Sequence, residues 1–222
     1  MQHKGLFITF EGPDGSGKTT CLKKVTVWLK ELIEQQKIQF NDVFVTREPG
    51  GKGNIMAERI RNLVLDTRDC TITDRTEALL FAASRASHVE LTIKPHLEQN
   101  DLVLSDRFVD SSLVYQGGTR NLGIDAIRTI NDFATAGLKP DFTFLLMVSA
   151  ETGLSRIAKN NRETNRLDDA GIEFHKKVQN FYNDLLNTDS DNRIILINAN
   201  LNEEEVFKQV QEKLIEKLHI NE

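Results

Sequence analysis

The sequence predicts an α/β fold in which a parallel sheet carries helices on both of its faces. Two observations indicate this fold. Short apolar runs alternate with longer stretches of helical periodicity, and the runs lack the polar alternation of a half-exposed strand. Strands that are buried on both faces are expected to be continuously apolar. The five predicted strands are residues 6–10, 43–46, 102–105, 142–148 and 194–197.

Helices are predicted between these strands from the spacing of apolar residues. The helix after the first strand, for example, places Leu22, Val25 and Leu29 on one face. The predicted helices are residues 18–36, 54–65, 74–99, 108–116, 124–136, 151–160, 170–187 and 203–218. Pro95 lacks a backbone N–H, so we expect it to bend or end the third of these helices.

Composition narrows the class of protein. A chain of 222 residues is most simply one domain, so we expect residues 1–222 to form a single unit. No run of about 20 apolar residues or signal peptide is apparent, which predicts a cytoplasmic protein with no membrane partner. The net charge of −5 argues against a nucleic-acid partner. The two cysteines, Cys21 and Cys70, offer neither a disulfide framework nor a metal cluster.

The segment over residues 12–19 satisfies G-x-x-x-x-G-K-[ST] and directly follows the apolar run 6–10. In such a loop the backbone N–H groups point at an anion, Lys18 compensates the β- and γ-phosphates, and the Thr19 hydroxyl can bind Mg²⁺. A glycine-rich turn could match by chance, but a strand before and an amphipathic helix after favour a nucleoside triphosphate site. Its predicted residues are Gly12, Pro13, Asp14, Gly15, Ser16, Gly17, Lys18, Thr19 and Thr20.

Other candidate residues follow later strands, because ligands of open α/β sheets collect at the carboxyl ends of the strands. Asp106 ends the third strand, where a carboxylate could coordinate Mg²⁺, and the adjacent Arg107 could bind a second phosphate. The alternatives are a helix N-cap for Asp106 and a surface ion pair for Arg107. Phe81 and Arg85 are four residues apart and share one helix face. Taken alone, this pair is better explained as a core aromatic and a surface arginine.

A basic segment over residues 156–169 stands apart from the rest of the chain. It places Arg156, Lys159, Arg162 and Arg166 among polar residues. A solvated helix face is the usual explanation of such a charge run. Beside a triphosphate site the segment is predicted to act as a basic lid.

Four motifs together resemble the bacterial thymidylate kinase family. They read FEGPDGSGKTT over residues 10–20, TREPGG over 46–51, RTEALLFAASR over 75–85 and DRFVDSSLVYQG over 106–117. The resemblance spans essentially the whole chain. It implies a P-loop nucleoside monophosphate kinase fold with a five-stranded parallel sheet, usually as a homodimer. It also implies phosphorylation of dTMP to dTDP with ATP and Mg²⁺, in dTTP biosynthesis.

The resemblance also implies roles for residues at the nucleotide. Phe81 would stack on thymine, and Arg85 would donate to a thymine carbonyl. Tyr115 would crowd the ribose 2′ position, and Asp14 would accept the 3′-OH. The residues expected to bind dTMP are Asp14, Glu48, Arg61, Phe81, Arg85, Arg107, Ser112, Tyr115 and Gln116, with Arg61 and Arg107 at its phosphate.

The transfer itself is expected to depend on alignment and on neutralising charge, since the attacking phosphate oxygen is already anionic and requires no general base. Some relatives carry an arginine inside the phosphate-binding loop, where this chain has Gly15 and Ser16. We therefore expect the lid to supply that charge, through Arg162 and Arg166, with Arg156 in the preceding helix. The residues expected to act in catalysis are Lys18, Asp106, Arg107, Arg156, Arg162 and Arg166, and Thr19 and Asp106 are expected to hold Mg²⁺.

Two departures from the family pattern bear on these roles. The segment over residues 52–56 is longer than the family pattern, which affects the assignment of Arg61. Phe108 stands where the family usually has a tyrosine. Two alternatives remain: another nucleoside monophosphate or deoxynucleoside kinase, and a nucleotide-dependent switch or partner-binding ATPase. Phe81 with Arg85 and the basic segment argue against the first. The second would usually carry a guanine-reading Asn-Lys-x-Asp motif, which this sequence lacks.

Overall fold

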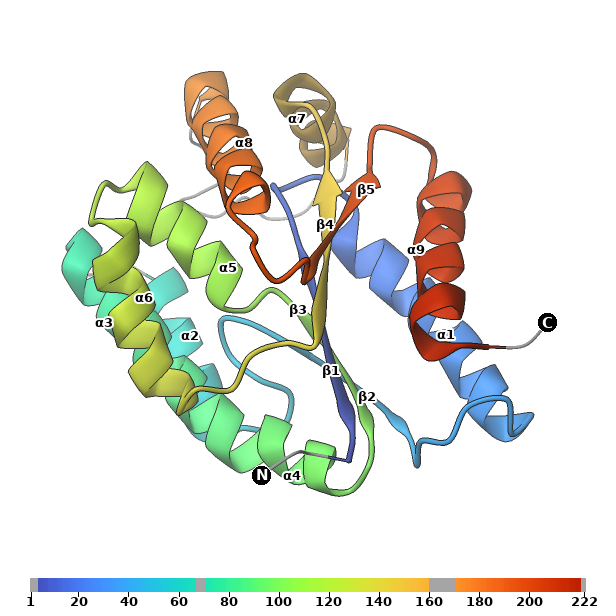
Figure 1. The fold of residues 1–222 in the computed structure, drawn as a ribbon. Coiled ribbons are helices and arrows are strands. Elements are labelled where there is room, and N and C mark those ends of the chain that lie inside the picture. Colours follow the sequence, from blue (N-terminus) through green and yellow to red (C-terminus); the bar gives the residue numbers. More distant parts are fainter. Residues whose placement is uncertain (1–3, 67–70, 160–170, 221–222) are drawn as a thin grey trace.

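The computed structural model describes residues 4–66, 71–159 and 171–220. A five-stranded sheet lies at its centre, with strand order β2-β3-β1-β4-β5 and every neighbouring pair parallel (Figure 1). The strands are β1 (Leu6–Glu11), β2 (Val43–Arg47), β3 (Leu102–Asp106), β4 (Phe142–Met147) and β5 (Ile194–Asn198). The predicted fold class is therefore confirmed, and each predicted strand agrees with the structure to within one residue at either end.

The helices also follow the predicted periodicity. The α-helices are α1 (Lys18–Glu34), α2 (Ile55–Leu65), α3 (Asp74–His88), α4 (Lys94–Glu98), α5 (Val109–Ser112), α6 (Ile124–Thr135), α7 (Ala150–Lys159), α8 (Ile172–Asn187) and α9 (Glu203–Leu218). Two π-helical segments interrupt them, η1 (Val89–Ile93) and η2 (Leu113–Thr119). Local signals set several boundaries: Asn54 caps α2 through its side chain, and Asn202 and Glu205 form a capping box at the start of α9.

Pro95 does not end the helical path predicted over residues 74–99. The chain passes from α3 through the π-helical turn η1 into α4, and Pro95 lies in the first turn of α4. A proline is tolerated there because the first N–H groups of a helix make no bond within it. The helix predicted over 108–116 likewise divides into α5 and η2 and extends to Thr119.

Helices cover both faces of the sheet (Figure 1). On one face α1 and α9 pack against side chains such as Ile8 and Phe144. On the other face η1, α4 and α8 pack against the alternate residues of the same strands, including Phe7 and Leu145. Because both faces are covered, the central strands are apolar throughout, as the sequence predicts.

The carboxyl ends of the parallel strands lie at one edge of the sheet. The register pairs Phe10 of β1 with Asp106 of β3, and Arg47 of β2 with the same aspartate. The segments that leave these strands therefore meet at this edge, and they build the candidate site. Within the described ranges, no helix is both long and apolar enough to cross a bilayer.

Candidate functional site

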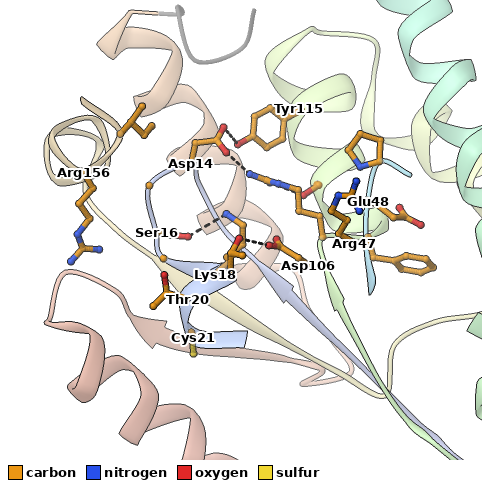
Figure 2. A pocket seen from close by; sticks show the side chains of 18 of the residues that line it. Asp14, Ser16, Lys18, Thr20, Cys21, Arg47, Glu48, Asp106, Tyr115 and Arg156 are labelled. Atoms are coloured by element: carbon orange, nitrogen blue, oxygen red, sulfur yellow. Dashed lines mark hydrogen bonds and ion pairs between the residues drawn. The ribbon is translucent and has the colours of Figure 1, made fainter. Parts of the chain in front are cut away.

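A cavity of about 690 Å³ opens at the carboxyl edge of the sheet. Its walls come from the loop after β1, the segments after β2 and β3, and parts of α3, η2, α7 and α9. Figure 2 shows side chains on both sides of the loop after β1, with Arg156 on one side and Glu48 and Tyr115 on the other. The lining residues thus lie on two sides of the loop, and we call these two parts of the cavity its arms.

The loop between β1 and α1 has a backbone that requires glycine at two positions. Gly12 and Gly15 have φ of 138° and 77°. A Cβ on Gly12 would lie 2.3 Å from the carbonyl oxygen of Leu146, and one on Gly15 would lie 2.3 Å from that of Gly153. Side chains are thus excluded by both backbone conformation and space. This curled backbone, leading into the N-terminus of α1, is the geometry of a phosphate-binding loop.

Lys18 folds back over this loop in the structure. Its Nζ donates to the carbonyl oxygens of Gly12 and Pro13, both at 2.9 Å, and to Ser16 Oγ at 3.3 Å. Burial, followed by the nearby charge of Arg107, lowers the pKa of Lys18 to about 8. Gly12 and Pro13 contribute these carbonyls and do not line the cavity, whereas Asp14, Gly15, Ser16, Gly17, Lys18, Thr19 and Thr20 do.

Thr19 and Asp106 lie side by side although they are 87 positions apart. The Thr19 hydroxyl donates to Asp106 Oδ2 at 2.7 Å, from the first turn of α1 to the end of β3. A hydroxyl and a carboxylate beside a phosphate-binding loop fit Mg²⁺, which uses one or two protein oxygens together with phosphates and water. No larger cluster of carboxylate, imidazole or thiol groups suited to a metal occurs in the described part of the chain.

Arg107 is held at the junction of the two arms. One of its terminal nitrogens donates to Asp14 Oδ1 at 2.6 Å, and the Tyr115 hydroxyl donates to Asp14 Oδ2 at 3.2 Å. The guanidinium carbon lies 5.2 Å from the centre of the Tyr115 ring. These contacts place a fixed cation beside the phosphate-binding loop, where it can bind a second anion.

Arg85 lies in the floor of the other arm and is almost fully engaged. Its Nε donates to Glu48 Oε2 at 2.6 Å, and one terminal nitrogen donates to Ser112 Oγ at 3.1 Å and to Asn131 Oδ1. The other terminal nitrogen donates to the Phe108 carbonyl at 3.1 Å. A guanidinium has five N–H groups, so these contacts leave one for a ligand.

Glu48 supports Arg85 from the segment after β2. Its second oxygen lies 3.0 Å from Nδ1 of the buried His88, whose Nε2 lies 2.7 Å from Thr46 Oγ1. The sequence predicts Glu48 to bind substrate. In the structure it lines the cavity, and its carboxylate is bound by Arg85 and His88.

The other predicted substrate residues gather in the same arm. Phe81, Ser112 and Gln116 line it, and Gln116 Nε2 donates to Glu77 Oε1 at 3.1 Å. Arg61 also lines the cavity, and its terminal nitrogen donates to the Pro49 carbonyl at 2.7 Å. The longer segment over residues 52–56 therefore does not move Arg61 away from the site.

Arg156 belongs to α7 and borders the first arm. Its terminal nitrogens donate to the carbonyls of Ala199 and Leu201, at 2.7 and 2.9 Å. Beyond it the cavity continues to Leu201, Asn202, Glu203 and Val206. Of the predicted lid over 156–169, only residues 156–159 are described, and Arg162 and Arg166 lie outside the described residues.

The structure also reveals polar residues that sequence reasoning missed. Glu11, Ser111, Asn131 and Tyr182 are buried and bonded to predicted site residues or to each other. Glu11 and Ser111 lie within the motifs over residues 10–20 and 106–117, and this position in a motif could have identified them as site residues. Asn131 and Tyr182 lie on helices whose apolar periodicity indicates only a core face.

Known proteins resemble this chain in both sequence and fold. The family model described as thymidylate kinase matches residues 10–210. A curated thymidylate kinase of Lactobacillus acidophilus is 47% identical over 216 residues, covering 97% of this chain and 96% of that protein. One of Finegoldia magna is 50% identical over 210 residues, covering 94% and 97%. The crystal structure of thymidylate kinase from Ehrlichia chaffeensis has a TM-score of 0.73 and 30% identity, covering 95% of this chain and 98% of that one.

Proposed function

The chain belongs to the thymidylate kinase family, and we propose that it phosphorylates dTMP to dTDP with ATP and Mg²⁺, in dTTP biosynthesis. The observation that carries this proposal is the two-armed cavity. A phosphate-binding loop lies at its centre, and an arginine beside an aromatic residue lies in one arm. Two nucleotides bound in the two arms would bring their phosphates together at the loop. The near-complete match to relatives supports a single catalytic domain over residues 1–222.

The arm bordered by Arg156 is suited to ATP. The β- and γ-phosphates would accept hydrogen bonds from the loop, and Lys18 would exchange its carbonyl partners for phosphate oxygens. The purine would extend toward Leu201 and Val206, which line the end of that arm. Thr19 and Asp106 would hold Mg²⁺, which when bound neutralises charge on the phosphates.

The other arm is suited to dTMP. Phe81 would stack on thymine, and the N–H that Arg85 retains would donate to a thymine carbonyl, with Ser112 and Gln116 at the remaining polar edge. Tyr115 would crowd the ribose 2′ position. Asp14, which accepts hydrogen bonds from Arg107 and from the Tyr115 hydroxyl, would also accept the 3′-OH.

Transfer requires an oxygen of the dTMP phosphate to attack the γ-phosphorus while the bond to the β-phosphate oxygen breaks and ADP leaves. Arg107 and Arg61 would align the attacking phosphate, and Lys18 would compensate the charge that develops on the leaving group. Arg162 and Arg166 would complete this compensation from the lid. The attacking oxygen is anionic, so no residue is required to remove a proton.

We also propose that the protein is a homodimer. Exposed apolar side chains concentrate on the layer formed by α2, α3, η1 and α6, in which α3 contacts each of the other three elements. They are Ile55, Met56, Leu63, Leu79, Leu91 and Phe133. Such a concentration is unusual on a free surface and supports burial against a second copy.

The function is tested by a coupled assay that follows ADP formation from ATP with a panel of nucleoside monophosphates. We expect turnover with dTMP to exceed that with dCMP, dGMP and dAMP, and to require Mg²⁺. Lys18→Ala is the control, because it removes the phosphate-compensating charge and should lower kcat far more than it raises KM for dTMP. A preference for another monophosphate, or ATP hydrolysis that is independent of any acceptor, would overturn the proposal.

A further inference from the structure

Glu11 is a buried carboxylate to which the proposed reaction gives no role. It is the last residue of β1, directly before Gly12 of the phosphate-binding loop, and it is 1% exposed. Burial, followed by the nearby charge of Asp110, raises its pKa to about 7. Burying a carboxylate in this position therefore costs more free energy than burying an apolar side chain would. This cost points to a function for the hydrogen bonds that the carboxylate makes.

Four donors converge on this carboxylate. Oε1 accepts from the backbone N–H of Phe108 at 2.7 Å and from that of Ser111 at 3.2 Å. Oε2 accepts from Ser111 Oγ at 2.6 Å and from the Tyr182 hydroxyl at 3.0 Å. An ionised carboxylate has about four acceptor positions, so this set of donors matches the charged form.

These donors lead to Arg107. The Phe108 N–H belongs to the peptide that directly follows Arg107, whose φ of 73° lies in the left-handed region that a side chain disfavours. Ser111 Oγ donates to Glu11 and accepts from an Arg107 terminal nitrogen at 2.9 Å. Glu11 thus restrains Arg107 through both its backbone and its guanidinium.

Tyr182 connects α8 to the contacts between Glu11 and Arg107. Its ring is fully buried, its hydroxyl reaches Glu11, and the same hydroxyl lies 3.2 Å from Ser111 Oγ and 3.5 Å from Arg107. The Glu11 and Tyr182 positions are 171 residues apart in the sequence. The hydroxyl is the only polar group of this side chain, so its effect can be removed without disturbing the packing of the ring.

We propose that Glu11 and Tyr182 are positioning residues for Arg107, which hold its guanidinium where it binds the phosphate of the acceptor nucleotide. The inference rests on the proposed function in one respect, that the ligand of Arg107 is the dTMP phosphate. Neither residue lies among those that line the cavity, so both act through Arg107.

The test compares dTMP with thymidine, which lacks the phosphate, by calorimetric titration of the full chain. Tyr182→Phe and Glu11→Gln should weaken dTMP binding by about fivefold or more, because a restraint on a charged group is lost. Both variants should leave thymidine affinity within about twofold, since base and sugar contacts remain. In an Arg107→Ala background, neither substitution should weaken dTMP binding further, because coupled residues are not additive.

Thr92→Val is the matched control. It also removes a buried hydroxyl, which accepts a hydrogen bond from Asn54 at 3.3 Å, and it lies in η1 outside the cavity lining. It should change neither affinity. If Glu11→Gln does not fold, Tyr182→Phe carries the test alone. Equal weakening of dTMP and thymidine, or a loss that persists in the Arg107→Ala background, would overturn the inference. Failure of the unmodified protein to bind dTMP would instead overturn the proposed function.

Discussion

At the scale of single residues, the environment of Lys18 is one that we expect phosphate binding to change. In the structure its ammonium is buried against carbonyl oxygens, and its pKa is lowered to about 8. Phosphate oxygens would favour the charged form and return the pKa toward the ordinary value of 10.5. At a pH between these two pKa values, Lys18 has mostly lost its proton in the free protein and retains it in the complex.

We therefore predict that binding of ATP with Mg²⁺ takes up about one proton at pH 9 and almost none at pH 6.5. Isothermal calorimetry in two buffers of different ionisation enthalpy measures this uptake directly. Lys18→Met keeps the aliphatic stem but cannot titrate, so its binding should show no uptake at either pH. Equal enthalpies in both buffers at pH 9 would show that Lys18 remains charged in the free protein.

Arg85 has a structural role in addition to the contact with thymine that we propose for it. Arg85→Ala would remove the donor to thymine and would also leave the carboxylate of Glu48, 4% exposed, without its cation. Loss of one partner of a buried ion pair typically costs about 3–5 kcal/mol. We predict a large loss of stability in this variant, measured by urea unfolding.

The double variant Arg85→Ala with Glu48→Gln removes both charges and should recover part of that stability. Its preference for dTMP over dCMP should remain reduced, because the donor to the carbonyl is still absent. Phe81→Ala is a useful contrast, since this half-buried ring should affect nucleotide binding by about 1–3 kcal/mol with little effect on unfolding. A double variant that selects dTMP as strongly as the parent would exclude Arg85 from base recognition.

At the scale of elements, the arginine within α7 and the arginines that follow it are expected to have different roles. Arg156 is bonded to the carbonyls of Ala199 and Leu201, so it joins α7 to the loop between β5 and α9. Arg162 and Arg166 follow α7 in the sequence, in the predicted lid. An arginine that meets the transferring phosphoryl group can contribute about 10³–10⁵ in rate.

We predict that Arg162→Ala or Arg166→Ala lowers the rate of phosphoryl transfer by much more than tenfold while dTMP affinity stays nearly unchanged. Lysine at the same position should restore only part of the rate, because it lacks the planar fork of donors. Arg156→Ala should mainly raise KM for ATP, since it loosens a wall of that arm. Single-turnover kinetics measures all three. If neither lid variant slows transfer by more than about tenfold, or roughly 1.4 kcal/mol, the segment is a solvated surface.

At the scale of the whole molecule, the distribution of exposed apolar side chains predicts assembly. Phe133 of α6 is 91% exposed, and Leu63 of α2 is 52% exposed on the same helical layer. We predict that the chain of 25.2 kDa sediments at twice that mass and that Phe133→Glu with Leu63→Glu shifts it toward the monomer.

Val27→Glu is the matched control for this prediction. Val27 is 59% exposed on α1, which covers the opposite face of the sheet, so the same change of charge there should leave the assembly intact. Analytical ultracentrifugation distinguishes these cases. A monomeric parent protein at micromolar concentration would exclude the proposed homodimer.

Much of the fold was predictable because its signals are local. Strands buried on both faces are continuously apolar, and helices repeat their apolar residues every three to four positions, so five strands and most helix boundaries follow from the residues themselves. The π-helical segments were not predicted. Their backbone hydrogen bonds span five residues and depend on packing. The spacing of apolar residues therefore does not predict η1 before Pro95 or η2 after Ser112.

By itself, the sequence determined that this protein has a phosphate-binding loop on a parallel sheet, because that loop is one contiguous segment and its glycines act locally. Only the tertiary structure decided how the surrounding charges are paired. Glu48 with Arg85 and Glu11 with Tyr182 are contacts between residues 37 and 171 positions apart. Which buried carboxylate meets which donor depends on how helices pack across the sheet, and so does the lowered pKa of Lys18. No spacing within one segment encodes that packing.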